Sequence, residues 1–325
     1  MNNQVWYYRI EHGQPTLVSN REYLGTVDYV RLGAEHAAVL TGGRITLQLI
    51  DMESAGGSAA SAAQKIFPEK ENESDITCMA MTSDFLIYST SRGAIHFFSL
   101  EDWTFVNEFR FKLGIRKIFP NPLGTRIVLI DDTNAGYLYS PVNDQTVPIE
   151  RLSGSTEKVM WDQNDWGVFV AVDPRCFTTY VYSPNSRRGA RVEAVKQQLQ
   201  LNSDQVCWTD RPSGFVPILA YGGIVTCQTA TGSLAQVSLE THSCLGQIRK
   251  DSRDLLVRAF YQNLHLLRLK EAYESAALVN GLNCWNDLAA TAIDVLDIEM
   301  AIRVCESQNS FFFAFFRLCA RAIWA

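Results

Sequence analysis

A strand–turn–strand pattern recurs along the chain, and it constrains the fold more than any other feature. In its clearest copy, residues 85–88 and 95–100 form two apolar runs, separated by the turn-forming residues Ser91, Arg92 and Gly93. Both runs are apolar at nearly every position, which predicts that both faces of each strand are buried. Since a lone hairpin cannot bury both of its faces, this pair must lie between neighbouring strands.

The same layout returns at a regular distance. Further copies are residues 37–40 with 45–51, 126–130 with 137–140, 168–172 with 179–183 and 224–227 with 234–239, and residues 5–10 form a partial copy as a single strand. Each return strand ends in a large apolar or aromatic residue followed by a small polar one: Ile50-Asp51, Phe98-Ser99, Tyr139-Ser140, Tyr182-Ser183 and Val237-Ser238, with Tyr8 at the matching place before Arg9. Allowing for a flexible Gly/Ser/Ala insertion at 55–63 and a polar insertion at 187–204, the period is about 42 residues.

A period of about 40–45 residues with several short strands is typical of a β-propeller blade. The recurring aromatic–polar pair occupies the place of the Trp-Asp pair in WD repeats, in a degenerate form. We therefore predict that residues 1–250 form an incomplete WD-type propeller of about five to six blades.

The pattern changes after residue 250. Apolar residues recur at helical spacing, and residues 271–279 resemble residues 299–307. Asp251-Ser252 is a predicted cap of the first helix, Asn280-Gly281 a predicted helix stop, and Asn283 a predicted N-cap. Trp285 begins a helix at a spacing suited to packing between helices. Residues 251–306 are thus predicted to be the first helices of a tetratricopeptide-like α-solenoid, followed by an apolar, aggregation-prone tail at 307–325.

No catalytic motif stands out. The sequence contains no phosphate-binding loop, dinucleotide fingerprint, nucleophile elbow or zinc-protease motif. The remaining candidates are interpreted structurally: Asp131-Asp132 as a turn, Asp294, Asp297 and Glu299 as helix-end residues, His96 as a packed strand residue, and Trp161, Trp166 and Trp208 as core aromatics, with an aromatic ligand cage as the alternative. We expect no catalytic, cofactor-binding or metal-binding residues.

Charge and cysteine usage exclude several classes of protein. The net charge is -6, and the short basic cluster at 187–191 is interpreted as a solvated loop, so no nucleic-acid partner is expected. No apolar run is long enough for a transmembrane segment, and the N-terminus lacks a secretory signal. The eight cysteines form no C-x-x-C pair and are predicted to be buried thiols in a reducing compartment.

Several stretches resemble a known family. They are MNNQVWYYRI at the N-terminus, EYLGTV (22–27), SDFLIYSTSRGAIHFFSLEDWTFVNEFR (83–110), KIFPNPLGTRIVLIDD (117–132) and YSPVND (139–144). Together they resemble the second propeller of a WD-repeat subunit of intraflagellar transport complex A. Residues 225–229 and 285–304 are similar to the continuation of that subunit into its solenoid, so the resemblance covers about residues 1–304.

The resemblance implies a non-catalytic scaffold that binds other complex A subunits and, indirectly, cytoplasmic dynein trains and a tubby-like adaptor. It implies retrograde transport, cilium assembly and entry of ciliary membrane proteins, on the cytoplasmic side of the cilium or flagellum and basal body. The family extends beyond both ends of the resemblance, so we expect an unclosed ring here and a fragment or an irregular gene model with an unmatched 305–325 ending. The alternatives are a vesicle-coat or nuclear-pore scaffold, and a propeller enzyme or lectin with a ligand in its central channel.

Overall fold

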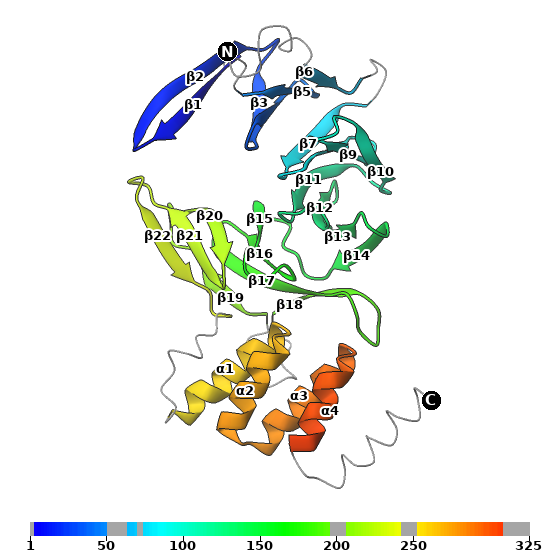
Figure 1. Cartoon of the computed structure of the whole chain (residues 1–325), viewed down its shortest axis with the longest axis vertical. Helices are drawn as coiled ribbons and strands as arrows, with labels where there is room; N and C mark the ends of the chain where they lie inside the picture. Colours follow the sequence, from blue (N-terminus) through cyan, green and yellow to red (C-terminus); the bar gives the residue numbers. More distant parts are fainter. Residues whose placement is uncertain (1–2, 51–63, 70–73, 196–205, 242–251, 308–325) are drawn as a thin grey trace. The chain divides into compact units, whose positions relative to one another are not determined.

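The computed structural model describes residues 3–50, 64–69, 74–195, 206–241 and 252–307 (Figure 1). The chain divides into two compact units, residues 1–146 and residues 147–325. Each unit consists mainly of antiparallel strands, and the second also contains helices. The predicted flexible insertion at 55–63 and the predicted tail from residue 308 onward lie outside the described residues.

The described part of the first unit contains one hairpin, two four-stranded sheets and four further consecutive strands that belong to a larger sheet. Within each of these sets of four, successive strands are neighbours, as in a propeller blade. The strands are β1 (Gln4–Glu11), β2 (Gln14–Glu22), β3 (Val27–Leu32), β4 (His36–Thr41), β5 (Arg44–Leu49), β6 (Gln64–Phe67), β7 (Ile76–Met81), β8 (Phe85–Thr90), β9 (Ala94–Ser99), β10 (Phe105–Arg110), β11 (Ile115–Pro120), β12 (Ile127–Asp131), β13 (Gly136–Ser140) and β14 (Gln145–Ile149), the last of which runs into the second unit.

Strands β8 and β9 lie between two other sheets, as their apolar sequence predicts. Leu86 and Phe98 pack into a core shared with the β3–β6 sheet. Ile87 and Phe97, which point the other way because side chains alternate along a strand, pack into a core shared with β11–β13. The predicted burial of both faces is confirmed (Figure 1).

The prediction of a single strand at residues 5–10 is incomplete. Strand β1 pairs with β2 in an antiparallel hairpin, and the turn between them has positive φ angles at His12 (51°) and Gly13 (77°). The second strand contains Pro15 and several polar residues, and its side chains are mostly exposed. Because it shows neither an apolar run nor a clear alternation, its sequence carries no strand signal.

The second unit begins with two sheets that share a core. The four-stranded set β15–β18, with β19 also paired to β17, packs against the three-stranded sheet β20–β22 through side chains such as Val170, Phe177 and Val225. The strands are β15 (Lys158–Trp161), β16 (Val168–Val172), β17 (Cys176–Ser183), β18 (Arg191–Ala194), β19 (Trp208–Asp210), β20 (Val216–Tyr221), β21 (Ile224–Gln228) and β22 (Leu234–Ser238).

The recurring aromatic–polar pair marks the third strand of its sheet. Phe98-Ser99, Tyr139-Ser140, Tyr182-Ser183 and Val237-Ser238 end β9, β13, β17 and β22 respectively. The sequence reading missed the fourth strands, which are mixed in polarity because one of their faces meets solvent. In particular, β18 lies inside the stretch 187–204 that was interpreted as a polar insertion, and that interpretation is wrong for residues 191–194.

In the described part of the chain, four helices follow the strands, which confirms the predicted β-then-α order. They are α1 (Arg253–His265), α2 (Leu269–Val279), α3 (Leu282–Asp294) and α4 (Ile298–Ser307). Their shared core combines large side chains, such as Phe260 and Trp285, with small alanines that allow close approach. The two similar sequence segments fall in α2 and α4. Asn280 ends α2 in a left-handed conformation, as predicted, but Gly281 rather than Asn283 is the N-cap of α3.

Candidate protein-interaction site at the blade–helix joint

The second unit joins its helices to the edge of a blade. We call this region the joint and define it by the β17–β18 hairpin, the β15–β16 turn and helices α1 and α3. Its apolar part consists of Val168, Val181 and Val195 from the blade, packed against Leu266 and the partly buried Leu267, which follow α1. Burying these apolar side chains away from water favours one fixed packing of the helices against the blade.

Two ion pairs flank this apolar contact. Arg191 of β18 pairs with Asp294 at the C-terminal end of α3, and their side chains are 23% and 32% exposed. Arg268, between α1 and α2, pairs with Asp165 of the β15–β16 turn at 3.2 Å (Nε to Oδ2). A cation at the end of α3 also interacts favourably with the helix dipole. These pairs tie the helices to the blade at two separate points.

Residues 187–189 of the basic cluster are exposed in a loop, as predicted, but the cluster also contacts α3. Besides the Arg191 ion pair, the backbone N–H of Arg187 donates a hydrogen bond to the carbonyl oxygen of Asp294 at 2.9 Å. Asp294 is the last residue of α3, as its interpretation as a helix-end residue requires, and its carboxylate also contacts the blade. The spacing between Arg191 and Asp294, which is 103 residues, left no local signal of this contact.

The loop that carries Arg187 and Arg188 is fixed by its own hydrogen bonds. The hydroxyl of Ser186 donates to the carbonyl oxygen of Gly189 at 2.6 Å and accepts from the backbone N–H of Arg188 at 3.2 Å. The N–H of Gly189 closes the turn on the carbonyl oxygen of Ser186 at 2.9 Å, with a positive φ of 87° that glycine adopts without strain. The backbone of Arg188 is thus held in one place beside α3.

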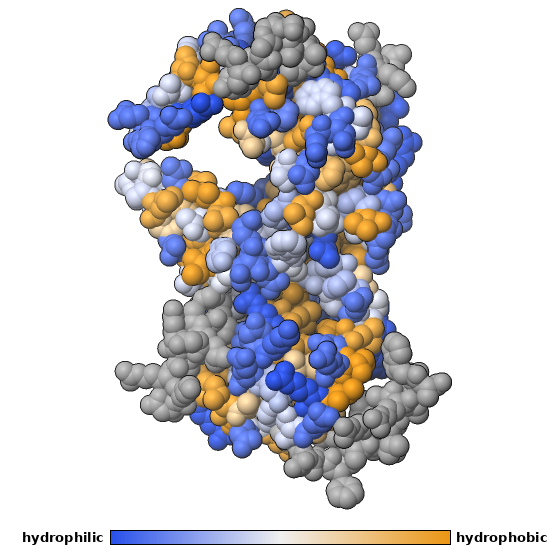
Figure 2. Space-filling model, in the orientation of Figure 1, coloured by the Kyte–Doolittle hydropathy of each residue, from blue (hydrophilic) through white to orange (hydrophobic). Residues whose placement is uncertain are grey.

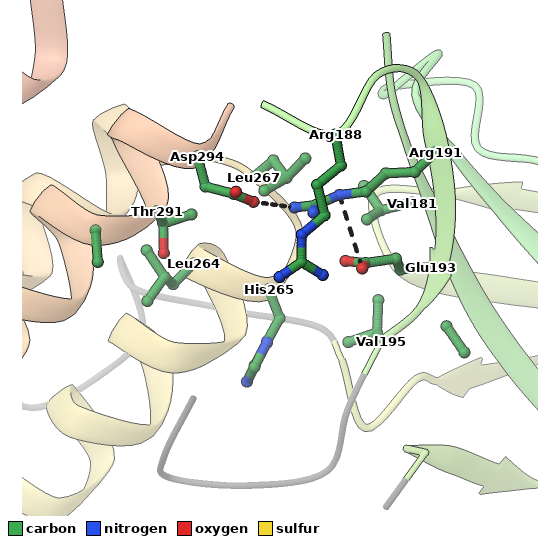
Figure 3. A pocket seen from close by; sticks show the side chains of 12 residues that line it. Val181, Arg188, Arg191, Glu193, Val195, Leu264, His265, Leu267, Thr291 and Asp294 are labelled. Carbon is green, nitrogen blue, oxygen red and sulfur yellow. Dashed lines mark hydrogen bonds and ion pairs between the residues drawn. The ribbon is translucent and has the colours of Figure 1, made fainter. Parts of the chain in front are cut away.

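A cavity of about 510 Å³ lies within the joint. Figure 3 shows that charged side chains of the β17–β18 hairpin face it from one side and residues of α1 and α3 from the other. Its walls combine apolar side chains (Val181, Val195, Leu264 and Leu267) with polar and charged ones (Arg188, Arg191, Glu193, His265, Thr291 and Asp294). This volume and mixture suit a small ligand or a few residues of a peptide.

The candidate acidic and histidine residues have structural roles. Asp131 accepts hydrogen bonds from the N–H and hydroxyl of Thr133, at 2.9 and 2.7 Å, and from the N–H of Ala135 at 2.9 Å, which confirms the predicted turn. Asp297 accepts from the N–H of Met300 at 3.0 Å, a helix cap. His96 stacks on Tyr88 with ring centroids 4.9 Å apart.

The described residues contain no group of three or more His, Cys, Asp or Glu side chains able to hold a metal ion. Over the same part of the chain, no helix is long and apolar enough to cross a membrane.

The tryptophan prediction is only partly right. Trp161 is buried, with 4% of its surface exposed, whereas Trp166 and Trp208 are 51% and 53% exposed. Trp166 lies in the turn between β15 and β16, and Trp208 lies on the short strand β19, whose partner among the described strands is β17. The described strands leave both of these aromatic side chains about half exposed.

The cysteines near the joint and in the blades are poorly reactive. The six cysteines within the described residues are free thiols. Burial raises the pKa of Cys207, near the joint, and of Cys78, in β7, to about 11. These thiols are protonated at neutral pH and are weak nucleophiles.

A second surface of the unit is apolar. On the β20–β22 sheet, the face opposite the buried Ala220 and Val225 exposes Leu219, Tyr221 and Leu234 by 43%, 58% and 69%. Figure 2 shows apolar surface over these strands. Exposed apolar groups gathered on one sheet are typical of a protein-contact surface.

Comparisons with known proteins agree on one family. The human WD repeat-containing protein 19 is 36% identical over 306 residues, which are 94% of this chain and 22% of that protein. The Caenorhabditis elegans WD repeat-containing protein dyf-2 is 29% identical over 303 residues, 90% of this chain and 20% of that protein. The chain thus spans about a fifth of the length of these relatives.

Among solved structures, Kluyveromyces lactis Hsv2 is similar with a TM-score of 0.36 and 12% identity, over 59% of this chain and 82% of that one. Structural similarity at this level does not indicate a function. The family model described as WDR19 second beta-propeller matches residues 1–242, which include every described strand. The resemblance seen in the sequence is therefore confirmed, and the chain belongs to the WDR19 second beta-propeller family.

Proposed function

We propose that this chain is part of a non-catalytic scaffold subunit of intraflagellar transport complex A. The observation that carries the proposal is the family match over residues 1–242, together with 36% identity to the human WD repeat-containing protein 19. In this role the chain binds other complex A subunits and supports retrograde transport, cilium assembly and entry of membrane proteins into the cilium. Its place is the cytoplasmic side of the cilium and basal body, with dynein trains and a tubby-like adaptor as indirect partners.

The geometry supports a scaffold role in two ways. The joint ties the helices to a blade through an apolar contact and two ion pairs, so that partners bound to either part are held at a set distance. The exposed apolar side chains of the β20–β22 sheet provide a surface for a protein partner. Large rigid surfaces of this kind are what a scaffold needs, because affinity comes from preorganised contacts rather than from reacting groups.

The test is affinity purification of the tagged chain from ciliated cells, followed by mass spectrometry. We expect the other subunits of complex A among the recovered proteins. A Tyr221→Asp variant places a charge on the exposed β20–β22 face and should reduce recovery, whereas Leu24→Asp, at a fully exposed position of the first unit, should not. Recovery of vesicle-coat or nuclear-pore proteins without complex A subunits would contradict the proposal.

A further inference from the structure

Arg188, an exposed residue of the loop before β18, lines the cavity in the joint. Figure 3 shows the side chain of Arg188 reaching into the cavity between His265 and Glu193. Among the residues that the structure describes, none forms an ion pair or hydrogen bond with its guanidinium. Since arginine side chains are mobile unless held, a guanidinium placed over a cavity on a fixed loop is suited to receive a partner.

Both carboxylates of the cavity lie within ion-pair distance of Arg191. Asp294 pairs with Arg191, and Glu193 lies 3.7 Å from the Nε atom of the same guanidinium. Figure 3 shows both contacts on the Arg191 side of the cavity, with Arg188 reaching toward His265. The cavity therefore offers a separate cationic position at Arg188, next to carboxylates that Arg191 partly neutralises.

The apolar wall of the cavity indicates which groups a bound ligand carries next to its negatively charged group. Val181, Val195, Leu264 and Leu267 supply apolar wall, and the volume of about 510 Å³ exceeds the space that one carboxylate needs. A protein segment with acidic residues between apolar ones satisfies both features, because its carboxylate can form a forked hydrogen-bonded pair with a guanidinium. A bare inorganic anion would leave the apolar wall in contact with water.

We infer that the joint cavity is a binding site for an acidic–apolar peptide segment of a partner protein, with Arg188 as the group that holds its carboxylate. The inference deepens the proposed scaffold role by naming the chemistry of one partner contact, and it rests on that role for the identity of the ligand as a protein. The loop hydrogen bonds of Ser186 and Gly189 fix the backbone of Arg188 before the partner arrives, so that binding does not have to order the loop.

The test uses the purified full chain and a fluorescently labelled short peptide that alternates leucine and glutamate, with blocked ends. Anisotropy titrations compare it with a peptide in which glutamine replaces each glutamate. We expect the acidic peptide to bind at least about tenfold more tightly, and we expect its affinity to fall with added salt. The purified system contains no ciliary partner, so its outcome is independent of the proteins recovered from cells.

Variants of neighbouring residues identify the site. Arg188→Gln should weaken binding of the acidic peptide by about tenfold or more, and Arg188→Lys should retain part of it. The matched control is Arg187→Gln, which makes the same charge change one residue away, where the side chain does not line the cavity. Ala290 of α3 is exposed and lines the cavity. As an independent variant, Ala290→Trp fills the cavity and should therefore weaken binding of the acidic peptide.

Three outcomes would overturn the inference. These outcomes are no binding, equal binding of the acidic and glutamine peptides, and equal losses in Arg187→Gln and Arg188→Gln. A matched phosphoserine peptide that binds more tightly than the glutamate peptide would overturn the assignment to carboxylates. Circular dichroism of each variant shows that it is folded, so that a lost affinity is not a lost structure.

Discussion

The ion pair between Arg191 and Asp294 should measurably tie the helices to the blade. The perturbation is a pair of substitutions that remove charge and keep shape, Arg191→Met and Asp294→Asn, made singly and together. Each single substitution leaves one charge of a partly buried pair without its partner, which costs more than the pair contributes. The double variant corrects for this, so the coupling energy between the two substitutions is the quantity to predict.

The magnitude follows from the environment of the pair. At contact distance and an effective dielectric constant of about 20, two unit charges attract by roughly 5 kcal/mol before the cost of desolvation. The side chains of Arg191 and Asp294 are 23% and 32% exposed, so water screens part of this attraction. The cost of desolvating the buried parts of the two charged groups offsets a further part of it. Charge-assisted hydrogen bonds in such settings contribute about 1.5–3 kcal/mol and exposed pairs about 0.2–1 kcal/mol. We expect a coupling energy of about 1–2 kcal/mol.

The assay is urea unfolding of the four proteins, followed by circular dichroism in the helical region. The matched control is the pair of Arg258 and Glu240 in the same unit, whose atoms approach to 2.7 Å but whose side chains are 54% and 52% exposed. Its coupling energy should stay below about 0.5 kcal/mol, because both side chains remain in water. A coupling energy for Arg191 and Asp294 no larger than that of the control would refute the reasoning that burial strengthens this pair.

Two further predictions concern a buried side chain of the second unit and a half-buried one of the first. Leu288→Ala in α3, where the side chain is fully buried, should lower the free energy of unfolding by about 2–5 kcal/mol, whereas Leu282→Ala, 63% exposed, should change it by less than about 0.5 kcal/mol in the same urea titration. Burial lowers the pKa of His36, with the charge of Glu35 opposing the shift, so its neutral form is favoured in the folded state. The stabilisation from this shift is present above the ordinary histidine pKa of about 6.5 and is lost as the pH falls through the lower folded value. The slope of stability against pH in this range should be smaller in His36→Gln than in the parent, and an unchanged slope would contradict the assignment.

The middle strands of the blades and the helices could be predicted from sequence because their signals are local. Residues 85–88 and 95–100 are apolar at successive positions, and a strand apolar on both faces has to lie between two other layers. The helices from residue 252 onward repeat apolar residues at a spacing close to one turn, and Asn280-Gly281 marks a helix end through its backbone preference. Such patterns depend on the side chains of one short segment and on no distant partner.

Strands β2 and β18 escaped prediction because polar, half-exposed strands resemble loops in sequence. Their strand conformation comes from backbone hydrogen bonds to the neighbouring strands β1 and β17. The exposure of Trp166 and Trp208 likewise depends on which strands lie next to them. An aromatic residue carries the same sequence signal whether a neighbouring layer covers it or not.

The candidate site depended most on tertiary structure. Nothing local connects Arg191 with Asp294, or Asp165 with Arg268, because the partners of each pair are 103 residues apart. The sequence specified that residues 187–191 are basic and that α3 ends near an aspartate. Only the seating of Leu266 and Leu267 against Val168 and Val181 brings these groups together and encloses the cavity that Arg188 enters. The periodicities of strand and helix are properties of neighbouring residues, whereas a joint is a property of surfaces that meet after both elements have formed.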